Sequence, residues 1–126
     1  MARQFRIGHT GITWGYTLDR VEPAIRDVAE LGYCAYETFG FTIEEYEQKE
    51  PGKLAALLEQ YGLPLGSVYC DTKFVDPAQA DADIEKVMLW ARQARALGAR
   101  AIVLQAVGRL WPASLARSAS GCRIWG

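Results

Sequence analysis

Residues 31–40 read LGYCAYETFG, and this stretch decides the fold. Its leucine and glycine close a predicted helix, because glycine past a helix C-terminus adopts the left-handed conformation without a Cβ penalty. A short apolar run then predicts a strand over residues 33–37, and Glu37 stands where that strand meets a loop. The same unit of helix, glycine and strand returns at Gly62 and at Gly98. Such repeats are typical of right-handed βαβ crossovers, so the sequence predicts an α/β fold of parallel strands alternating with helices.

Composition limits the size and the partners of the protein. The chain has 126 residues and is 50% hydrophobic, which suffices for one domain with a substantial core. A formal net charge of −1 gives no general attraction to nucleic acid or to an anionic membrane surface. No apolar run approaches the roughly 20 residues of a membrane span, and the first residues lack the apolar core of a signal peptide. We therefore expect a cytoplasmic protein without nucleic-acid or membrane partners.

The cysteines are Cys34, Cys70 and Cys122, an odd number with no C-x-x-C spacing. This pattern argues against both a disulfide framework and a structural zinc site. We expect reduced thiols, with Cys34 and Cys70 buried in strands.

The first half of the chain predicts two strands joined and followed by helices. Residues 5–9 form a candidate strand, and the glycine-rich sequence GHTGITWG continues from it as a tight loop. Asp19 and Thr42 are each followed three residues later by glutamate, and this capping-box pattern predicts a helix start at each of them. Residues 50–52, Glu-Pro-Gly, interrupt the second helix. We expect two short helices there, or one kinked helix.

The second half predicts a strand over residues 65–70, a long helix and a strand over residues 101–107. Asp76 with a proline directly after it is a strong helix start. The last strand is a nearly continuous apolar run, which is typical of a parallel strand covered on both faces. The apolar stripe of the long helix consists of Ile84, Val87, Met88, Ala91, Ala94 and Leu97.

Residues 109–126 differ in character from the rest. They hold no acidic residue, show no clear helical or strand period, and include two tryptophans among arginine, serine and alanine. They are either a poorly ordered terminus or not the natural continuation of the fold, as after a frameshift. We assign residues 1–108 to the fold and residues 109–126 to an atypical tail.

The order FRIGHTGITWG, GYCAYETFG, LPLGSVYCD and LGARAIVLQAVG, with helices between, resembles the amino-terminal half of the xylose-isomerase-like TIM barrels. That superfamily includes sugar phosphate isomerases and epimerases and inosose dehydratase. The resemblance covers about residues 5–108 and rests mainly on GITW at residues 11–14, on Glu37 and on the fourth strand. It implies a partial TIM barrel of about four βα units, because a complete (β/α)8 barrel takes roughly 200 residues or more.

The same resemblance implies a metal-dependent isomerase, epimerase or dehydratase of a sugar or polyol. In that family acidic and histidine residues at the ends of the later strands hold a divalent metal, Mn, Co or Mg, and two glutamates there move the proton. Those strands are not in this sequence, so we expect this chain to carry no metal site, cofactor or catalytic residue and to be inactive alone.

Active sites of such barrels lie at the C-terminal ends of the strands. The resemblance therefore implies substrate-binding candidates there, namely His9, Trp14, Glu37, Phe39, Tyr69 and Gln105, with Asp71 and Lys73 beside them. Each has a plainer explanation. A lone histidine is often a hydrogen-bonded loop residue, a carboxylate at a strand end can cap the next helix, and aromatic residues can simply pack. Asp71 and Lys73 can pair with each other at a solvated strand end, and the Gln105 amide can make a structural hydrogen bond.

Two other classes of function stay open. The first and fourth strands of a half barrel would be open sheet edges, so the chain could be a non-catalytic assembly module that pairs with another copy or with a complementary half. A small doubly wound domain would instead bind a ligand where the strand order reverses. Strand order separates these folds. The sequence lacks the glycine-rich motifs of nucleotide-binding loops and the elbow of a nucleophilic serine.

Overall fold

The computed structural model describes residues 5–72 and 76–106. The expectations for Lys73, for Cys122 and for the tail 109–126 lie outside the described residues. None of the helices in these two ranges is long and apolar enough to cross a membrane. In chain order the elements are β1 (His9–Thr10), η1 (Gly11–Trp14), α1 (Leu18–Glu30), β2 (Tyr36–Phe39), α2 (Gly40–Lys49), α3 (Lys53–Gln60), β3 (Leu65–Thr72), α4 (Ala80–Ala96) and β4 (Ala101–Ala106).

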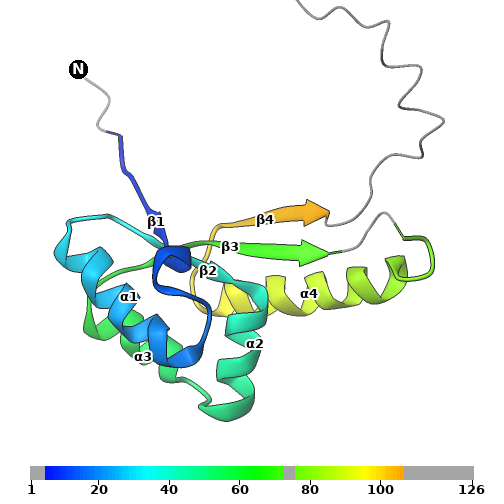
Figure 1. Cartoon of the computed structure of the whole chain (residues 1–126), viewed down its shortest axis with the longest axis horizontal. Coiled ribbons are helices and arrows are strands. Elements are labelled where there is room, and N and C mark those ends of the chain that lie inside the picture. Colours follow the sequence, from blue (N-terminus) through cyan, green and yellow to red (C-terminus); the bar gives the residue numbers. More distant parts are fainter. Residues whose placement is uncertain (1–4, 73–75, 107–126) are drawn as a thin grey trace, which may run out of the picture.

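The four strands form one parallel sheet in the order β1-β2-β3-β4. The α-helices gather on one side of this sheet (Figure 1). Sequential order with helices on one side is the arrangement of a barrel segment, so the predicted partial TIM barrel is confirmed. A doubly wound sheet would need a reversal of strand order, and that alternative is wrong.

The core lies between the sheet and the helices. Tyr36 of β2 and Val68 of β3 are buried against the apolar faces of the helices that cover them. Ile25 of α1, Ile43 of α2 and Leu54 of α3 are at most 1% exposed in the same cluster. Each helix therefore turns one apolar face to the sheet, as the helical spacing of apolar residues predicts.

Two predicted capping boxes do not form. α1 begins at Leu18, one residue before Asp19, and Thr17 precedes it without a side-chain cap. α2 begins at Gly40, so Thr42 lies buried inside the helix with no hydrogen-bond partner for its hydroxyl in the described structure. β2 runs directly into α2, and the packing of both elements, rather than a cap, sets where the helix starts. The predicted interruption near residue 51 is found, because α2 and α3 are separate short helices.

The first two strands begin later than predicted. β1 covers His9–Thr10 rather than residues 5–9, although the Cys34 N–H still donates to the Ile7 carbonyl at 2.9 Å. β2 covers Tyr36–Phe39 rather than residues 33–37. Cys34 therefore lies before the strand and is half-buried, whereas Cys70 is buried within β3 as expected.

α4 also begins later than its start signal. Asp76 and the proline after it form a turn, in which Asp76 Oδ1 accepts a hydrogen bond from the Ala78 N–H at 3.0 Å. The helix itself begins at Ala80, with Gln79 as its N-cap. Asp76 thus satisfies a backbone donor ahead of the helix rather than capping it.

Apolar side chains of α4 and β4 stay exposed at the β4 edge of the sheet. Val87, Trp90 and Ala94 of α4 are buried, whereas Ile84 and Met88 are 53% and 51% exposed. β4 is exposed as well, so the prediction of a strand covered on both faces is wrong for the described structure. The spacing of apolar residues predicts which side chains could be buried here, but no described element lies over them.

Candidate functional site

The register of the strands decides which side chains share a face of the sheet. Tyr36 and Val68 lie in the core under the helices. Side chains alternate along a strand, so the neighbouring positions Glu37 and Ser67 lie on the opposite face, which we call the inner face. Glu37 and Ser67 are also register partners, and Ser67 in turn pairs with Ala101 of β4.

Two further rows of side chains lie on the inner face toward the C-terminal ends of the strands. Phe39 is the register partner of Tyr69, and Asp71 is the register partner of Gln105. Each of these positions is an even number of residues from Glu37 or Ser67 on its own strand or from a register partner of theirs. Along the strands, toward their C-terminal ends, the carboxylate of Glu37 is therefore followed first by an aromatic row and then by a polar row.

These rows line a hollow with a volume of about 530 Å³. Four of the six sequence candidates for substrate binding, Glu37, Phe39, Tyr69 and Gln105, meet there, together with Asp71. Phe39, Tyr69, Asp71 and Gln105 lie in the C-terminal halves of β2, β3 and β4, and Glu37 is the second of the four residues of β2. The full lining consists of Thr10, Ile12, Tyr16, Glu37, Phe39, Phe41, Tyr69, Asp71 and Gln105.

Aromatic rings form one wall of the hollow. Phe39 stacks on Phe41 with ring centroids 5.2 Å apart and meets the edge of Tyr69 at 5.6 Å. Tyr16 approaches Phe39 edge-on at 5.0 Å from the loop before α1. Offset and edge-to-face pairs are the favourable arrangements of aromatic rings, so these side chains hold one another in place.

Polar groups stand beside that wall. Ser67 donates a hydrogen bond from its hydroxyl to the Glu37 carboxylate, which fixes the orientation of Glu37. Asp71 and Gln105 are both exposed on their strands. The Gln105 side chain is thus not a buried amide that needs an internal partner, while its main-chain carbonyl accepts a hydrogen bond from the Thr72 hydroxyl at 3.2 Å.

His9 and Trp14, the other two candidates, do not line this hollow. His9 is the register partner of Tyr36, which places its side chain on the helix-covered face. Its ring meets the edges of Trp14 and Tyr33, with centroid distances of 5.5 Å and 4.9 Å. The structure therefore gives both residues packing contacts on the far side of the sheet from Glu37.

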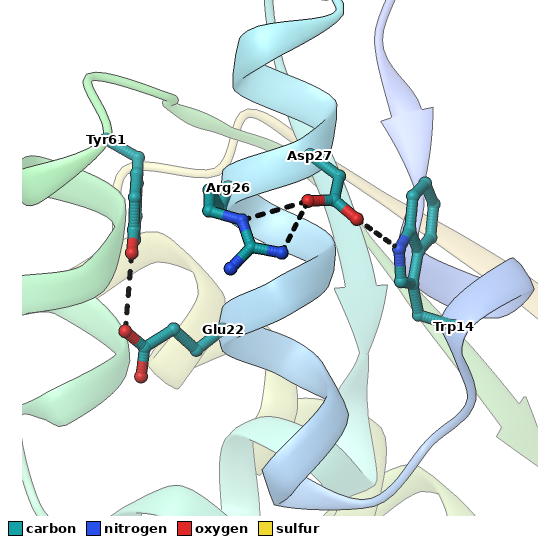
Figure 2. A network of polar contacts seen from close by, with 5 residues as sticks. All are labelled: Trp14, Glu22, Arg26, Asp27 and Tyr61. Carbon is teal, nitrogen blue, oxygen red and sulfur yellow. Dashed lines mark hydrogen bonds and ion pairs between the residues drawn. The ribbon is translucent and has the colours of Figure 1, made fainter.

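Trp14 belongs to a polar network on α1. Its indole N–H donates to Asp27 Oδ2 at 2.8 Å, and Arg26 donates to the other carboxylate oxygen from Nε and from a terminal nitrogen (Figure 2). The indole hydrogen bond, followed by that of Arg26, holds the pKa of Asp27 below its ordinary value of 3.8. On the same helix Glu22 accepts a hydrogen bond from Tyr61 (Figure 2). This network ties η1 and α3 to α1.

Sequence reasoning missed several lining residues, chiefly Tyr16 and Phe41. Phe41 follows two residues after Phe39, and the stretch TFGFT joins β2 to α2 without a loop. An aromatic pair at such a junction is the signal that would have found it. Tyr16 lies in a loop, where nothing in the local sequence shows which way the side chain turns.

Comparisons with known proteins agree with this architecture. No protein-family model matches the chain. The inosose dehydratase of Geobacillus kaustophilus (strain HTA426) is 28% identical over 114 residues, which cover 82% of this chain and 34% of the relative. A crystal structure of D-psicose 3-epimerase in the presence of D-fructose superposes with a TM-score of 0.65 and 20% identity, over 79% of this chain and 37% of the epimerase.

These similarities support a place in the xylose-isomerase-like TIM-barrel superfamily, of whose fold this chain covers a part. It spans about a third of the length of the relatives it matches. Its similarity to the epimerase is a similarity of fold, and the relative that it matches in sequence is an inosose dehydratase.

A divalent metal is implied by this superfamily, and the described residues do not form a site that fits one. They contain no group of three histidine, cysteine, aspartate or glutamate side chains that could hold a metal ion. Glu37 and Asp71 are the carboxylates that line the hollow. Two carboxylates are fewer than the ligand sets by which proteins usually hold a catalytic metal, so we derive no chemical step through one.

Proposed function

We propose that this chain forms the substrate-binding wall of a sugar or polyol isomerase, epimerase or dehydratase, and that it does not turn over substrate by itself. One observation carries the proposal. Phe39 and Tyr69 line one hollow with Glu37, Asp71 and Gln105, and all of these but Glu37 lie in the C-terminal halves of three adjacent strands. Active sites of TIM barrels are built at the C-terminal ends of the strands.

The chemistry of the wall suits a polyhydroxylated ring. A sugar has a face of C–H groups that can pack on aromatic rings, and hydroxyls around its rim that can hydrogen-bond to carboxylates and amides. The names of the relatives point to the same class of ligand, since one is a dehydratase of inosose and the other an epimerase of D-psicose crystallised with D-fructose. In this chain the aromatic row would set the plane of the ring, and Glu37, Asp71 and Gln105 would set its rotation.

Isomerisation and epimerisation need a base for a carbon-bound proton and stabilisation of the oxyanion that forms. Glu37 is a carboxylate held in place by Ser67, but the described residues provide neither a metal group nor a cationic side chain in the hollow to stabilise an oxyanion. We therefore assign binding and orientation, and not turnover, to this chain.

The test is titration of the ¹⁵N-labelled protein with D-fructose and with an inosose, followed by NMR. We expect saturable shifts around Tyr69 and Asp71 with a dissociation constant of roughly millimolar order, since the hollow is open on one side. Asp71→Asn and Tyr69→Leu should each weaken binding by about tenfold. Glu59→Gln on the exposed surface of α3 is the matched control and should bind like the unaltered protein.

Two results would count against the proposal. Absence of saturable shifts with either ligand would remove the binding assignment. Conversion of a ketose or an inosose by the purified chain with added Mn²⁺, Co²⁺ or Mg²⁺ would remove the claim that it does not turn over substrate.

A further inference from the structure

Both edges of the sheet are open in the described structure. β1 and β4 stand at the two ends of the strand order, each with one paired side. β4 is the longer edge, with six residues, and its Val103 is 42% exposed. An exposed edge strand presents a row of unpaired N–H and C=O groups and favours pairing with another strand.

Apolar side chains line both edges on the same face. Ile102 and Leu104 of β4 are register partners of Val68 and Cys70, which are buried under the helices, yet they are 38% and 51% exposed themselves. Ile7, two residues before His9 on the β1 side, is 65% exposed. His9 shares the helix-covered face, so Ile7 and the two β4 residues all lie on the outer face of the sheet.

We propose that two copies of this chain join head to tail, with β4 of each copy paired in parallel with β1 of the other. All four strands run in one direction, so a parallel neighbour continues the pattern of the sheet. β1 of a second copy offers that direction and its own open edge. In the junction Ile7 of one copy would meet Ile102 and Leu104 of the other, which removes apolar surface from water.

The strand count favours two copies over an open chain of them. The four described strands of each copy give eight, the number of strands in a TIM barrel. The same β4–β1 junction forms twice, so the pair is symmetric and leaves neither of the described edges free. A formal net charge of −1 on each copy opposes this contact only weakly.

Closure would also complete the hollow. One wall is made by Glu37, Phe39, Tyr69 and Gln105, and the side opposite the sheet is open. In the closed pair the inner faces of the two copies would face each other, so each copy would supply the missing wall for the other. This assembly does not depend on which ligand the hollow takes.

The test is the molar mass in solution, by sedimentation and light scattering under reducing conditions. We expect a dimer at about 50 µM. Ile7→Lys and Leu104→Glu should each weaken association at least about tenfold, because either change places a charge in both junctions of a homodimer. Both sites are exposed in the single chain, so folding should survive, as circular dichroism would show. Ala55→Lys on exposed α3 is the charge control and should stay dimeric.

Mixing the two variants gives the sharpest result. A mixed dimer of the Ile7→Lys and Leu104→Glu chains has one unaltered junction and one junction with opposite charges, so the dimer should return on mixing. A folded monomer of the unaltered protein up to about 200 µM would overturn the proposal. So would a Leu104→Glu monomer beside an Ile7→Lys dimer, which indicates antiparallel pairing of two β4 edges, or growth beyond two copies. These readings are independent of sugar binding, so either proposal can fail alone.

Discussion

The Trp14 indole N–H donates to the Asp27 carboxylate at 2.8 Å and joins the end of η1 to α1 (Figure 2). The chain continues from η1 into Tyr16, whose ring meets Phe39 in the hollow. A hydrogen bond on the outer side of the sheet thus helps to position an aromatic side chain on the inner side. The two residues stand 13 positions apart in the sequence.

Acid should weaken this link. The Trp14 and Arg26 hydrogen bonds hold the pKa of Asp27 below 3.8 in the folded protein. The lowered pKa adds stability above the pKa of the unfolded chain, and that stability is lost as the pH falls from about 4 through the folded value. A carboxyl ¹³C titration should find the Asp27 pKa below 3.8, and Trp14→Phe should raise it, because the principal hydrogen bond is gone. An unchanged pKa in Trp14→Phe would show that the indole is not the main cause.

The position of the Tyr36 side chain requires a glycine at residue 11. A Cβ at Gly11 would stand 2.0 Å from the Tyr36 hydroxyl oxygen and 2.8 Å from the ring carbon that bears it. Tyr36 is 2% exposed and cannot move aside without disturbing the core. Gly11→Ala should therefore lower the free energy of unfolding by about 2 kcal/mol, in the range of overpacked cores. Equilibrium unfolding in urea would measure this loss of stability.

The double variant Gly11→Ala with Tyr36→Phe isolates the cause. Removing the hydroxyl removes the closest atom, so the second change should recover part of the loss caused by the first. If the two losses simply add, the clash is not with the Tyr36 hydroxyl.

Much of the fold can be predicted from this sequence because its signals are local. A glycine after each helix and a short apolar run after each glycine identify β2, β3 and β4, and their sequential order follows from parallel crossovers. Boundaries depend on packing between distant segments. Thr42 has the spacing of a cap, yet the direct passage from β2 into α2 buries it instead. The prediction of burial is wrong at Met88 for a related reason. Met88 is apolar and lies at a core spacing, but no described element covers it.

The residues of the candidate site also differ in how far the sequence could predict their positions. Glu37, Phe39, Tyr69 and Gln105 lie on strands of known direction, and alternation along parallel strands brings them to one face. His9 also lies at a strand, but the one-residue offset between His9 and Thr10 turns its side chain to the opposite face. The sequence of so short a strand does not show which of its side chains faces the helices. Only the register of His9 with Tyr36 decides that.

Gly40 and Trp90 hold α2 against α4. A Cβ on Gly40 would stand 2.3 Å to 2.7 Å from three atoms of the indole of Trp90, which is 2% exposed and donates to Glu44 at 2.8 Å. Gly40→Ala should cost about 2–3 kcal/mol in the free energy of unfolding, because the indole is buried and held by its hydrogen bond to Glu44. Denaturant unfolding measures the loss. In a Trp90→Leu background the same change should cost much less, and an equal cost in both backgrounds would contradict the proposed clash.

Cys70 should resist thiol reagents in the folded protein. Burial raises the pKa of the Cys70 thiol to about 11, with a smaller contribution from Asp71, so at pH 8 about one molecule in a thousand carries the reactive thiolate. Cys34 is half-buried and outside the core, and its thiol donates to the Ile7 carbonyl at 3.1 Å. With Cys122→Ser as the parent, iodoacetamide at pH 8 should label Cys34 first and Cys70 only after urea is added. Peptide mass spectrometry would assign each label, and Cys34→Ser should leave a native protein that takes up almost none. Rapid native labelling of Cys70 would show that β3 opens far more readily than its place in the core allows.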